Sequence, residues 1–447
     1  MQFSQQHTRL TPPAQNLMGP SAKAHRWRRG ALCWTGVLGL MLTGGCTNPT
    51  PTQESSATVL QLTSDLDALQ VAGQALIIDT HIDVPYRLHK EYEDVSVSAG
   101  GDFDWPRANA GGLNAAFMSI YIPAKVDAEG GATQLANKLI DDVEAIIESA
   151  PDKFAPAHCS QDLASAKKAQ QISLPLGIEN GGPIAGDFAQ LNHFFERGVR
   201  YITLAHSKSN HISDSSYDTN ERWQGLSDFG KKLVPEMNRL GVMIDVSHLS
   251  DRAFWQVIEQ SQVPVIASHS SLRHFTPGFH RNMSDEMVLA MAKQGGVIQI
   301  NFGSTFLTAT ARAWSDRLSE QAKAYQEAQN LADDDPRLET FREQYRGAYP
   351  FPYASTEHVL NHIDRVVEIA GIDHVGLGSD YDGVGDSLPL GMKDASSYPN
   401  LVSGLLQRGY ELADIAKILG GNLLRVWRAN EAYAEAAGTP TRCATPS

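Results

Sequence analysis

Histidines and carboxylates follow several of the short apolar segments of this chain. His81 and Asp83 come at the end of the first such segment, and Glu179 follows a later one. His248 and His269 follow two more. Parallel strands present their carboxyl ends at one face of an α/β fold, and active sites are built there. These five side chains are therefore candidates for one site.

Their chemistry suits divalent metal ions. His81 and Asp83 are two positions apart, so on a strand they share one face, with Cα atoms roughly 6.5–7 Å apart. Imidazole and carboxylate suit zinc or another first-row divalent metal. A His-x-Asp pair is common by chance, so the prediction depends on the other three residues. One catalytic zinc ion needs three protein ligands and a water. Five ligands therefore predict a two-metal site, in which Glu179 bridges the ions and a water or hydroxide lies between them.

The elements that position these residues follow from hydrophobic patterning. Most of the apolar segments are continuous rather than alternating, which is typical of parallel strands covered on both faces. The predicted strands are 76–80, 115–122, 174–178, 201–205, 242–247, 265–268, 296–301 and 375–379. Helix-like segments lie between them, at 131–149, 187–197, 227–239, 250–261, 284–294 and 355–370. This alternation predicts an α/β fold, a (β/α)8 barrel of the TIM type.

A doubly wound open sheet is the alternative fold. It usually carries a Gly-rich phosphate-binding turn after its first strand, where this chain has His81-Ile82-Asp83. Between strands seven and eight, residues 310–347 are polar and helix-prone. We expect a helical insertion there, near the barrel mouth, which is either a lid or a solvated decoration.

The N-terminus has the three-part pattern of a secretory signal. A basic cluster at 23–29 precedes the apolar segment 31–42, which is too short to span a bilayer comfortably, and then small residues. The small residues before Cys46 resemble a bacterial lipobox, although Thr43 stands where an aliphatic residue is usual. We expect lipidation of Cys46 and a chain tethered to a membrane on the periplasmic side of the bacterial cell envelope. An uncleaved anchor, an ordinary cleaved signal and twin-arginine export are the alternatives.

The expected organisation is a signal peptide over 1–45, a flexible tether over 46–64, a barrel over 65–430 and a C-terminal tail over 431–447. The formal net charge of −14 argues against a nucleic-acid partner, which needs a basic face. Four cysteines cannot form a disulfide framework in 447 residues. Cys159 and Cys443 remain after export and lipidation. The sequence leaves open whether they pair.

Eight stretches together resemble the membrane dipeptidases, also called renal dipeptidases, which are amidohydrolase-like metallopeptidases. They occur in family order over residues 75–426: IIDTHIDVP (77–85), GIENGGP (177–183), ITLAHSKSN (202–210), IDVSHLSD (244–251), ASHSS (267–271), RN (281–282), HVGLGSDYDG (374–383) and GGNLLRV (420–426). The resemblance implies that His81 and Asp83 bind one zinc ion, that His248 and His269 bind the other, and that Glu179 is shared. It further suggests a homodimer.

The resemblance also implies three substrate contacts. His206 would lie at the scissile carbonyl, Arg281 would bind the terminal carboxylate, and Asp380 would bind the free amine or handle protons. These roles agree with the residue types: a guanidinium offers a fork for a carboxylate, and the leaving amine needs a proton. Asp245 is interpreted as structural and Asp382 as a turn former. The stretch after His206 differs from eukaryotic members, which leaves the side-chain preference open.

These observations predict an exported, zinc-dependent dipeptidase that cleaves free dipeptides with a metal-bridged hydroxide. Two ions per chain are expected, zinc or another first-row divalent metal. The resemblance implies tolerance of a D-residue at the C-terminal position. A related metal-dependent amidohydrolase, acting on another amide, a lactam or an ester, is the alternative. A non-catalytic binding protein would be expected to have lost ligands, and all five are present.

Overall fold

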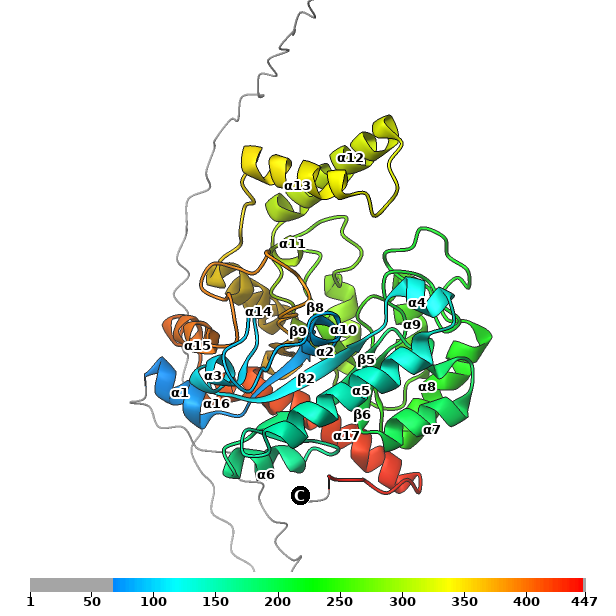
Figure 1. Ribbon diagram of the computed structural model, residues 1–447. Coiled ribbons are helices and arrows are strands. Elements are labelled where there is room, and N and C mark those ends of the chain that lie inside the picture. Colours follow the sequence, from blue (N-terminus) through cyan, green and yellow to red (C-terminus); the bar gives the residue numbers. More distant parts are fainter. Residues whose placement is uncertain (1–66, 445–447) are drawn as a thin grey trace, which may run out of the picture. The chain divides into compact units, whose positions relative to one another are not determined.

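A closed ring of parallel strands forms the centre of residues 67–444, the part of the chain that this computed structural model describes (Figure 1). Each strand of the ring pairs with the next, and the ring closes because β1 pairs with both β2 and β10. Its members are β1 (Ile77–Ile82), β2 (Leu113–Tyr121), β5 (Leu176–Glu179), β6 (Val199–Thr203), β7 (Met243–Asp245), β8 (Ile266–Ser270), β9 (Val297–Ile300) and β10 (Val375–Leu377). The predicted (β/α)8 barrel is confirmed, and an open sheet is excluded.

The strands are buried on both faces, which explains why their sequences are continuously apolar. Every residue of β1, β5, β6, β8 and β9 is buried. Two short strands were not predicted: β3 (Phe154–Pro156) and β4 (Ile172–Leu174) extend the sheet beside β2, where Ser173 pairs with Ala115. They are only three residues long, too short for a periodic signal.

Helices cover the outside of the ring in the expected alternation. Several begin at a serine whose side chain accepts a backbone hydrogen bond: Ser227 from Gly230, and Ser250 from Ala253. The helices around the barrel are α1 (Ala68–Gln74), α2 (Val84–Lys90), α3 (Trp105–Ala110), α4 (Ala124–Ala128), α5 (Ala132–Ser149), α6 (Asp162–Lys168), α7 (Phe188–Glu196), α8 (Asp228–Leu240), α9 (Asp251–Gln260), α10 (Asp285–Lys293), α14 (Thr356–Ala370), α15 (Tyr398–Gln407), α16 (Leu412–Ala416) and α17 (Asn422–Ala436).

Large side chains fill the inside of the barrel. Phe117 of β2 and Tyr201 of β6 are fully buried, with ring centroids 5.4 Å apart. Trp427 of α17 packs against Phe117 at 5.3 Å. In Figure 1, α17 runs below the strands, on the side away from the helical insertion. This packing leaves the other end of the barrel for the polar residues that follow the strands.

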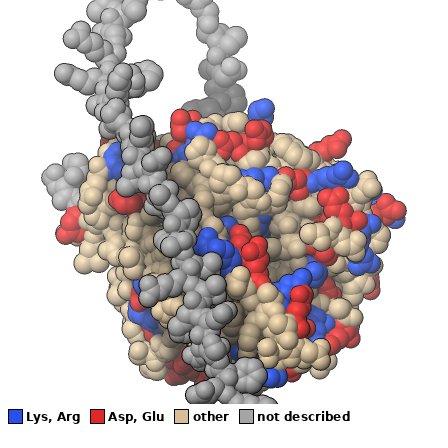
Figure 2. All heavy atoms as spheres, turned by 90° about the horizontal axis from the view of Figure 1, so that it is seen from above, with Lys and Arg blue, Asp and Glu red and all other residues tan. Residues whose placement is uncertain are grey.

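The helical insertion between β9 and β10 is confirmed. It consists of α11 (Ser304–Leu307), α12 (Ala309–Gln329) and α13 (Pro336–Ala348). In Figure 1, α12 and α13 lie side by side above the barrel. Their contacts include stacked rings of Tyr325 and Phe341, 4.7 Å apart. Figure 2 views the molecule from above, and basic and acidic side chains are interspersed on that face.

The C-terminal residues are attached to the barrel. Helix α17 continues past residue 430 to Ala436, and a disulfide joins Cys159 to Cys443. The side chain of Asp162 accepts a hydrogen bond from the backbone N–H of Ala444 at 2.9 Å. Within the described range, no helix has the length and apolar character needed to cross a membrane. The predicted signal peptide, Cys46 and the tether lie outside that range.

Candidate metal centre and active site

His81 is held by a hydrogen-bond chain inside the barrel. The Tyr201 hydroxyl donates to the backbone oxygen of Thr80 at 3.0 Å and lies 2.9 Å from Nδ1 of His81. The hydroxyl therefore accepts from Nδ1–H, which leaves a lone pair on Nε2 of His81. That atom is buried and has no hydrogen-bond partner within residues 67–444. Gly177 makes room for this chain, because a Cβ there would lie 2.0 Å from the Tyr201 ring.

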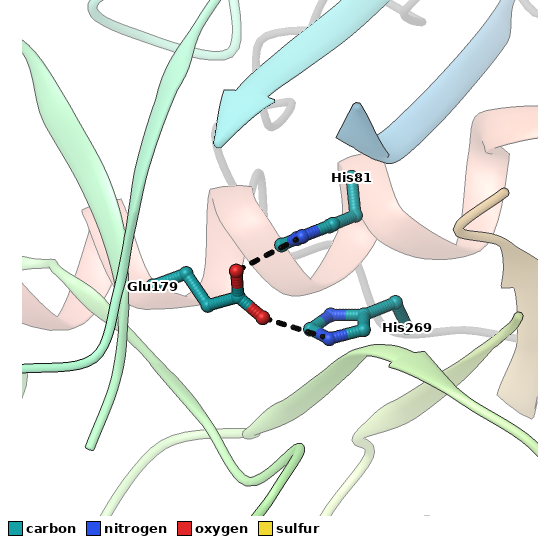
Figure 3. A group of neighbouring side chains, drawn as sticks. All are labelled: His81, Glu179 and His269. Carbon is teal, nitrogen blue, oxygen red and sulfur yellow. Dashed lines mark ion pairs between the residues drawn. The ribbon is translucent and has the colours of Figure 1, made fainter. Parts of the chain in front are cut away.

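Glu179 lies at the centre of the cluster, with its two carboxylate oxygens facing different imidazoles. Oε2 is 3.6 Å from Nε2 of His81, and Oε1 is 3.1 Å from Nε2 of both His248 and His269. Figure 3 shows His81 and His269 pointing at the carboxylate from two strands. The carboxylate is buried. A carboxylate placed in this way is suited to bridge two cations.

His269 is oriented by residues behind it. Its Nδ1 lies 2.7 Å from Oγ of Ser268, and that hydroxyl donates to Asp245 at 2.6 Å. Nε2 of His269 therefore faces the cluster, as a metal ligand requires. Asp245 also accepts from the backbone N–H groups of Ser268 and Ser247 at 2.7 and 3.0 Å. Its carboxylate is engaged in the barrel wall, consistent with the structural interpretation.

Asp380 lies beside Asp83 at the end of β10. Its backbone N–H donates to the His81 oxygen at 3.0 Å, and its Oδ2 accepts from Asn301 at 2.7 Å. Oxygen or nitrogen atoms of His81, Asp83 and Asp380 all lie within 4.8 Å of one another. Gly383 permits this approach, because a Cβ there would lie 2.2 Å from both carboxylates.

His206 and Arg281 complete the site. Nε2 of His206 is 3.5 Å from Oε1 of Glu179. Arg281 is buried, and its two terminal nitrogens donate to Ser270 Oγ and to the His269 backbone oxygen, each at 2.8 Å. Its Nε is also buried and has no partner among the described residues. These two bonds fix the plane of the guanidinium.

The predicted site residues thus come together around one cavity of about 1230 Å³. His81 is the one that does not line it, because its side chain is fully buried. Sequence reasoning missed Tyr201, Asn301 and Tyr217. Tyr217 lines the cavity with its ring 5.8 Å from that of His248. Tyr217 lies six positions beyond the unusual stretch 207–211 that follows His206, so no signal in the sequence pointed to it, and Tyr201 looked like any other strand residue.

The charges of the cluster favour bound cations. Burial lowers the pKa of His248 and of His269 well below the ordinary value, with nearby Arg281 acting in the same direction, so both are neutral. Burial raises the pKa of Asp380 to about 8, and the charge of Asp83 adds to this effect. Glu179 differs: burial opposes ionisation, but His206, His81 and two hydrogen-bonding imidazoles hold its pKa well below the usual range. The neutral imidazoles of His248 and His269, beside closely spaced carboxylates, are a donor set that fits divalent metal.

Comparison with known proteins agrees with this geometry. The sequence profile of the family described as membrane dipeptidase (Peptidase family M19) matches residues 66–441. The chain belongs to this family. It is a metallo-dipeptidase, a hydrolase of the metal-dependent type that the cluster around Glu179 suits.

Individual relatives cover the same region. Dipeptidase 3 of Mus musculus is 29% identical over 378 residues, which are 82% of this chain and 67% of that protein. The crystal structure of the probable dipeptidase PvdM from Pseudomonas aeruginosa is 28% identical, with a TM-score of 0.71 over 82% of this chain and 98% of its own. A metallopeptidase from Rhodobacter sphaeroides, liganded with a phosphinate mimic of L-Ala-D-Ala, shares the fold: 23% identity, a TM-score of 0.65, and coverage of 80% and 99%.

Proposed function

We propose that this chain is an exported dipeptidase that uses two zinc ions, or two other first-row divalent ions, to hydrolyse free dipeptides. The observation that carries the proposal is the carboxylate of Glu179, with Oε2 toward His81 and Oε1 toward His248 and His269. His81 and Asp83 would hold one ion, and His248 and His269 the other. When bound, the ions would activate a water near neutral pH and polarise the amide carbonyl.

His206 is proposed to act on the substrate carbonyl. Its Nε2 reaches the Glu179 carboxylate, and its ring centroid is 4.2 Å from that of His248. A donor at this position stabilises the negative charge that develops on the carbonyl oxygen during attack. Burial lowers the pKa of His206 although the nearby Glu179 opposes this effect, so the neutral ring, with one N–H, is the form available.

Asp380 and Arg281 are proposed to bind the two ends of the substrate. Asp380 has one carboxylate oxygen held by Asn301, which leaves Oδ1 for the amine or for proton transfer to the leaving group. Arg281 is held by Ser270 and His269 and offers its unpartnered Nε to a carboxylate. Because both ends are bound at once, a third residue would displace the carboxylate and leave a buried guanidinium unpaired, which is costly.

These contacts distinguish a dipeptidase from the alternative, an amidohydrolase with broader substrates. Neither end contact touches the second side chain directly, so a D-residue is proposed to be tolerated at that position. L-Ala-D-Ala is the natural test, since the Rhodobacter sphaeroides metallopeptidase of the same fold is liganded with a mimic of that dipeptide.

Export and membrane attachment through Cys46 are also proposed. The disulfide between Cys159 and Cys443 supports an oxidising compartment, because cytosolic proteins rarely keep such bonds. A homodimer, suggested by the family resemblance, is tested by light scattering of the purified protein.

The proposal is tested by metal analysis together with kinetics of the purified mature protein. We expect two zinc ions per active chain, and kcat/KM at least about 100-fold higher for Ala-Ala than for its C-terminal amide or for Ala-Ala-Ala. Glu179→Gln should weaken binding of both ions. Glu431→Gln, at a half-buried carboxylate that accepts from Ser160 outside the cluster, is the matched control and should keep both. One ion per fully active chain, or equal rates on the three substrates, would contradict the proposal.

A further inference from the structure

Aromatic side chains of the insertion and of the segment that follows α13 form a continuous row. The ring centroids of Tyr345 and Trp314 are 5.5 Å apart, those of Trp314 and Phe351 are 5.0 Å apart, and those of Phe351 and Tyr353 are 4.9 Å apart. The last three side chains line the same cavity as the metal ligands. Trp314 is nearly buried, with its indole N–H bonded to the Tyr349 oxygen at 2.9 Å, so the row is fixed in place. The insertion is therefore a wall of the active-site cavity.

The cavity is larger than the reaction itself requires. Its volume of about 1230 Å³ exceeds the roughly 300–1,000 Å³ that is typical of pockets for drug-sized ligands. The backbone of a dipeptide, held between Arg281 and Asp380, occupies only its inner part. The outer part, beside the aromatic row, is left for substrate side chains.

Contacts of the row indicate which end of the substrate it faces. The Tyr353 hydroxyl donates to Oδ2 of Asp386 at 2.6 Å, and Lys393 lies over the Tyr353 ring at 3.9 Å. Asp386 belongs to the loop that follows Asp380, the proposed partner of the substrate amine. The amine is carried by the first residue of a dipeptide, so a dipeptide bound as proposed has the side chain of that residue on the side of the loop that Tyr353 contacts.

The chemistry of this wall favours apolar groups. Phe351 and Tyr353 present partly exposed ring faces, and Leu318 and Val384 line the cavity near them. Two of the charged side chains nearby have ion-pair partners: Arg346 donates to Glu339 at 2.9 Å, and the Arg87 guanidinium pairs with Glu93 and Asp382. Aromatic faces bind apolar and aromatic side chains through large contact areas at favourable ring geometries.

We propose that the aromatic row of the insertion is a subsite for the side chain of the substrate's first residue, and that it selects bulky apolar or aromatic side chains. This inference rests on the proposed function, in which Asp380 binds the amine. It assigns to the insertion a role in substrate choice, separate from the metal centre and from the carboxylate contact of Arg281.

The test compares three dipeptides with the mature, metal-loaded enzyme. Wild type should have a kcat/KM at least about 10-fold higher for Phe-Ala than for Ala-Ala, with no such preference for Ala-Phe. Phe351→Ala should lower kcat/KM for Phe-Ala by about 10-fold and change that for Ala-Ala less than 2-fold. The control is Tyr325→Ala. Tyr325 belongs to the same insertion and stacks on Phe341, but it does not line the cavity, so this substitution should leave all three kcat/KM values unchanged.

Thermal unfolding and metal content show whether each variant is folded and loaded. If Phe351→Ala does not fold, Phe351→Leu replaces it. The wild-type ratio of kcat/KM for Phe-Ala to kcat/KM for Ala-Ala is also a test by itself, and a ratio near one overturns the inference. The inference is likewise overturned if the Phe351 variant loses kcat/KM equally on all three dipeptides, or only on Ala-Phe. Failure of wild type to cleave Ala-Ala or any other dipeptide refutes the proposed function instead, and the inference with it.

Discussion

Tyr201→Phe should weaken the metal site that includes His81. The substitution keeps the ring, which fits against Gly177, and removes only the hydroxyl that accepts from His81 and donates to Thr80. Tyr201 is fully buried, so water has no access to replace the hydroxyl. His81 would then have an unsatisfied Nδ1–H and a less fixed ring.

The expected loss of metal affinity can be judged from other hydrogen bonds that orient the ligands of a metal ion. Removing one usually costs 10–100-fold in metal affinity, which is about 1.4–2.7 kcal/mol. We expect the upper part of this range, because the Nδ1–H loses its partner inside the barrel. One ion per chain should be lost first, because His269, a proposed ligand of the other ion, is held independently of Tyr201 through Ser268.

The assay is dialysis against graded chelator followed by metal analysis, with activity measured on the same samples. Tyr410→Phe is the control, since it also removes a hydrogen-bonded tyrosine hydroxyl, but one that donates to the Asp364 carboxylate at 2.8 Å, outside the cluster. It should behave as wild type. If Tyr201→Phe retains both ions at every chelator concentration at which wild type does, the orientation argument for His81 is wrong.

Three further outcomes are expected. Asp380→Asn should keep both metals and lose roughly 100-fold or more in kcat, because an amide cannot transfer the proton; an active, metal-loaded variant would remove Asp380 from the mechanism. Cys46→Ser should move the full-length protein from the membrane to a soluble fraction without loss of specific activity, and unchanged fractionation would exclude lipidation. Burial lowers the pKa of His362 to about 3, so the unfolded chain binds a proton that the folded chain does not, and the free energy of unfolding should fall as the pH falls from about 6.5 toward 3. His362→Gln should reduce this slope by about 1.4 kcal/mol per pH unit, measured by denaturant unfolding of metal-free protein between pH 6 and 4; an unchanged slope would show that His362 is protonated in the folded state.

Local patterning was enough to predict the barrel. Segments such as 201–205 are buried on both faces, and this burial is what makes them continuously apolar. Helix starts are also local: Ser250 caps α9 by accepting a hydrogen bond from the backbone N–H of Ala253, only three residues further along the chain. Strands β3 and β4 were missed because three residues are too few to show a period.

The candidate metal ligands could be selected from the sequence for a related reason. His81 and Asp83 are chemically distinctive, and each follows a segment whose strand character is local. Once the strands are known to be parallel, their carboxyl ends must meet, so residues as far apart as His81 and His269 become candidates for one site. The pairing of Cys159 with Cys443 has no such rule and remained open until the fold was known.

The sequence by itself therefore determined the barrel, the position of its insertion and the set of polar residues at its mouth, because burial and residue chemistry act locally along the chain. Only the tertiary structure decided which oxygen of Glu179 faces which imidazole, that Tyr201 orients His81, and that Trp314 and Phe351 line the cavity. These features join residues 69 to 120 positions apart or depend on the path of the insertion. They result from packing between distant segments, which leaves no periodic or local signal in the sequence.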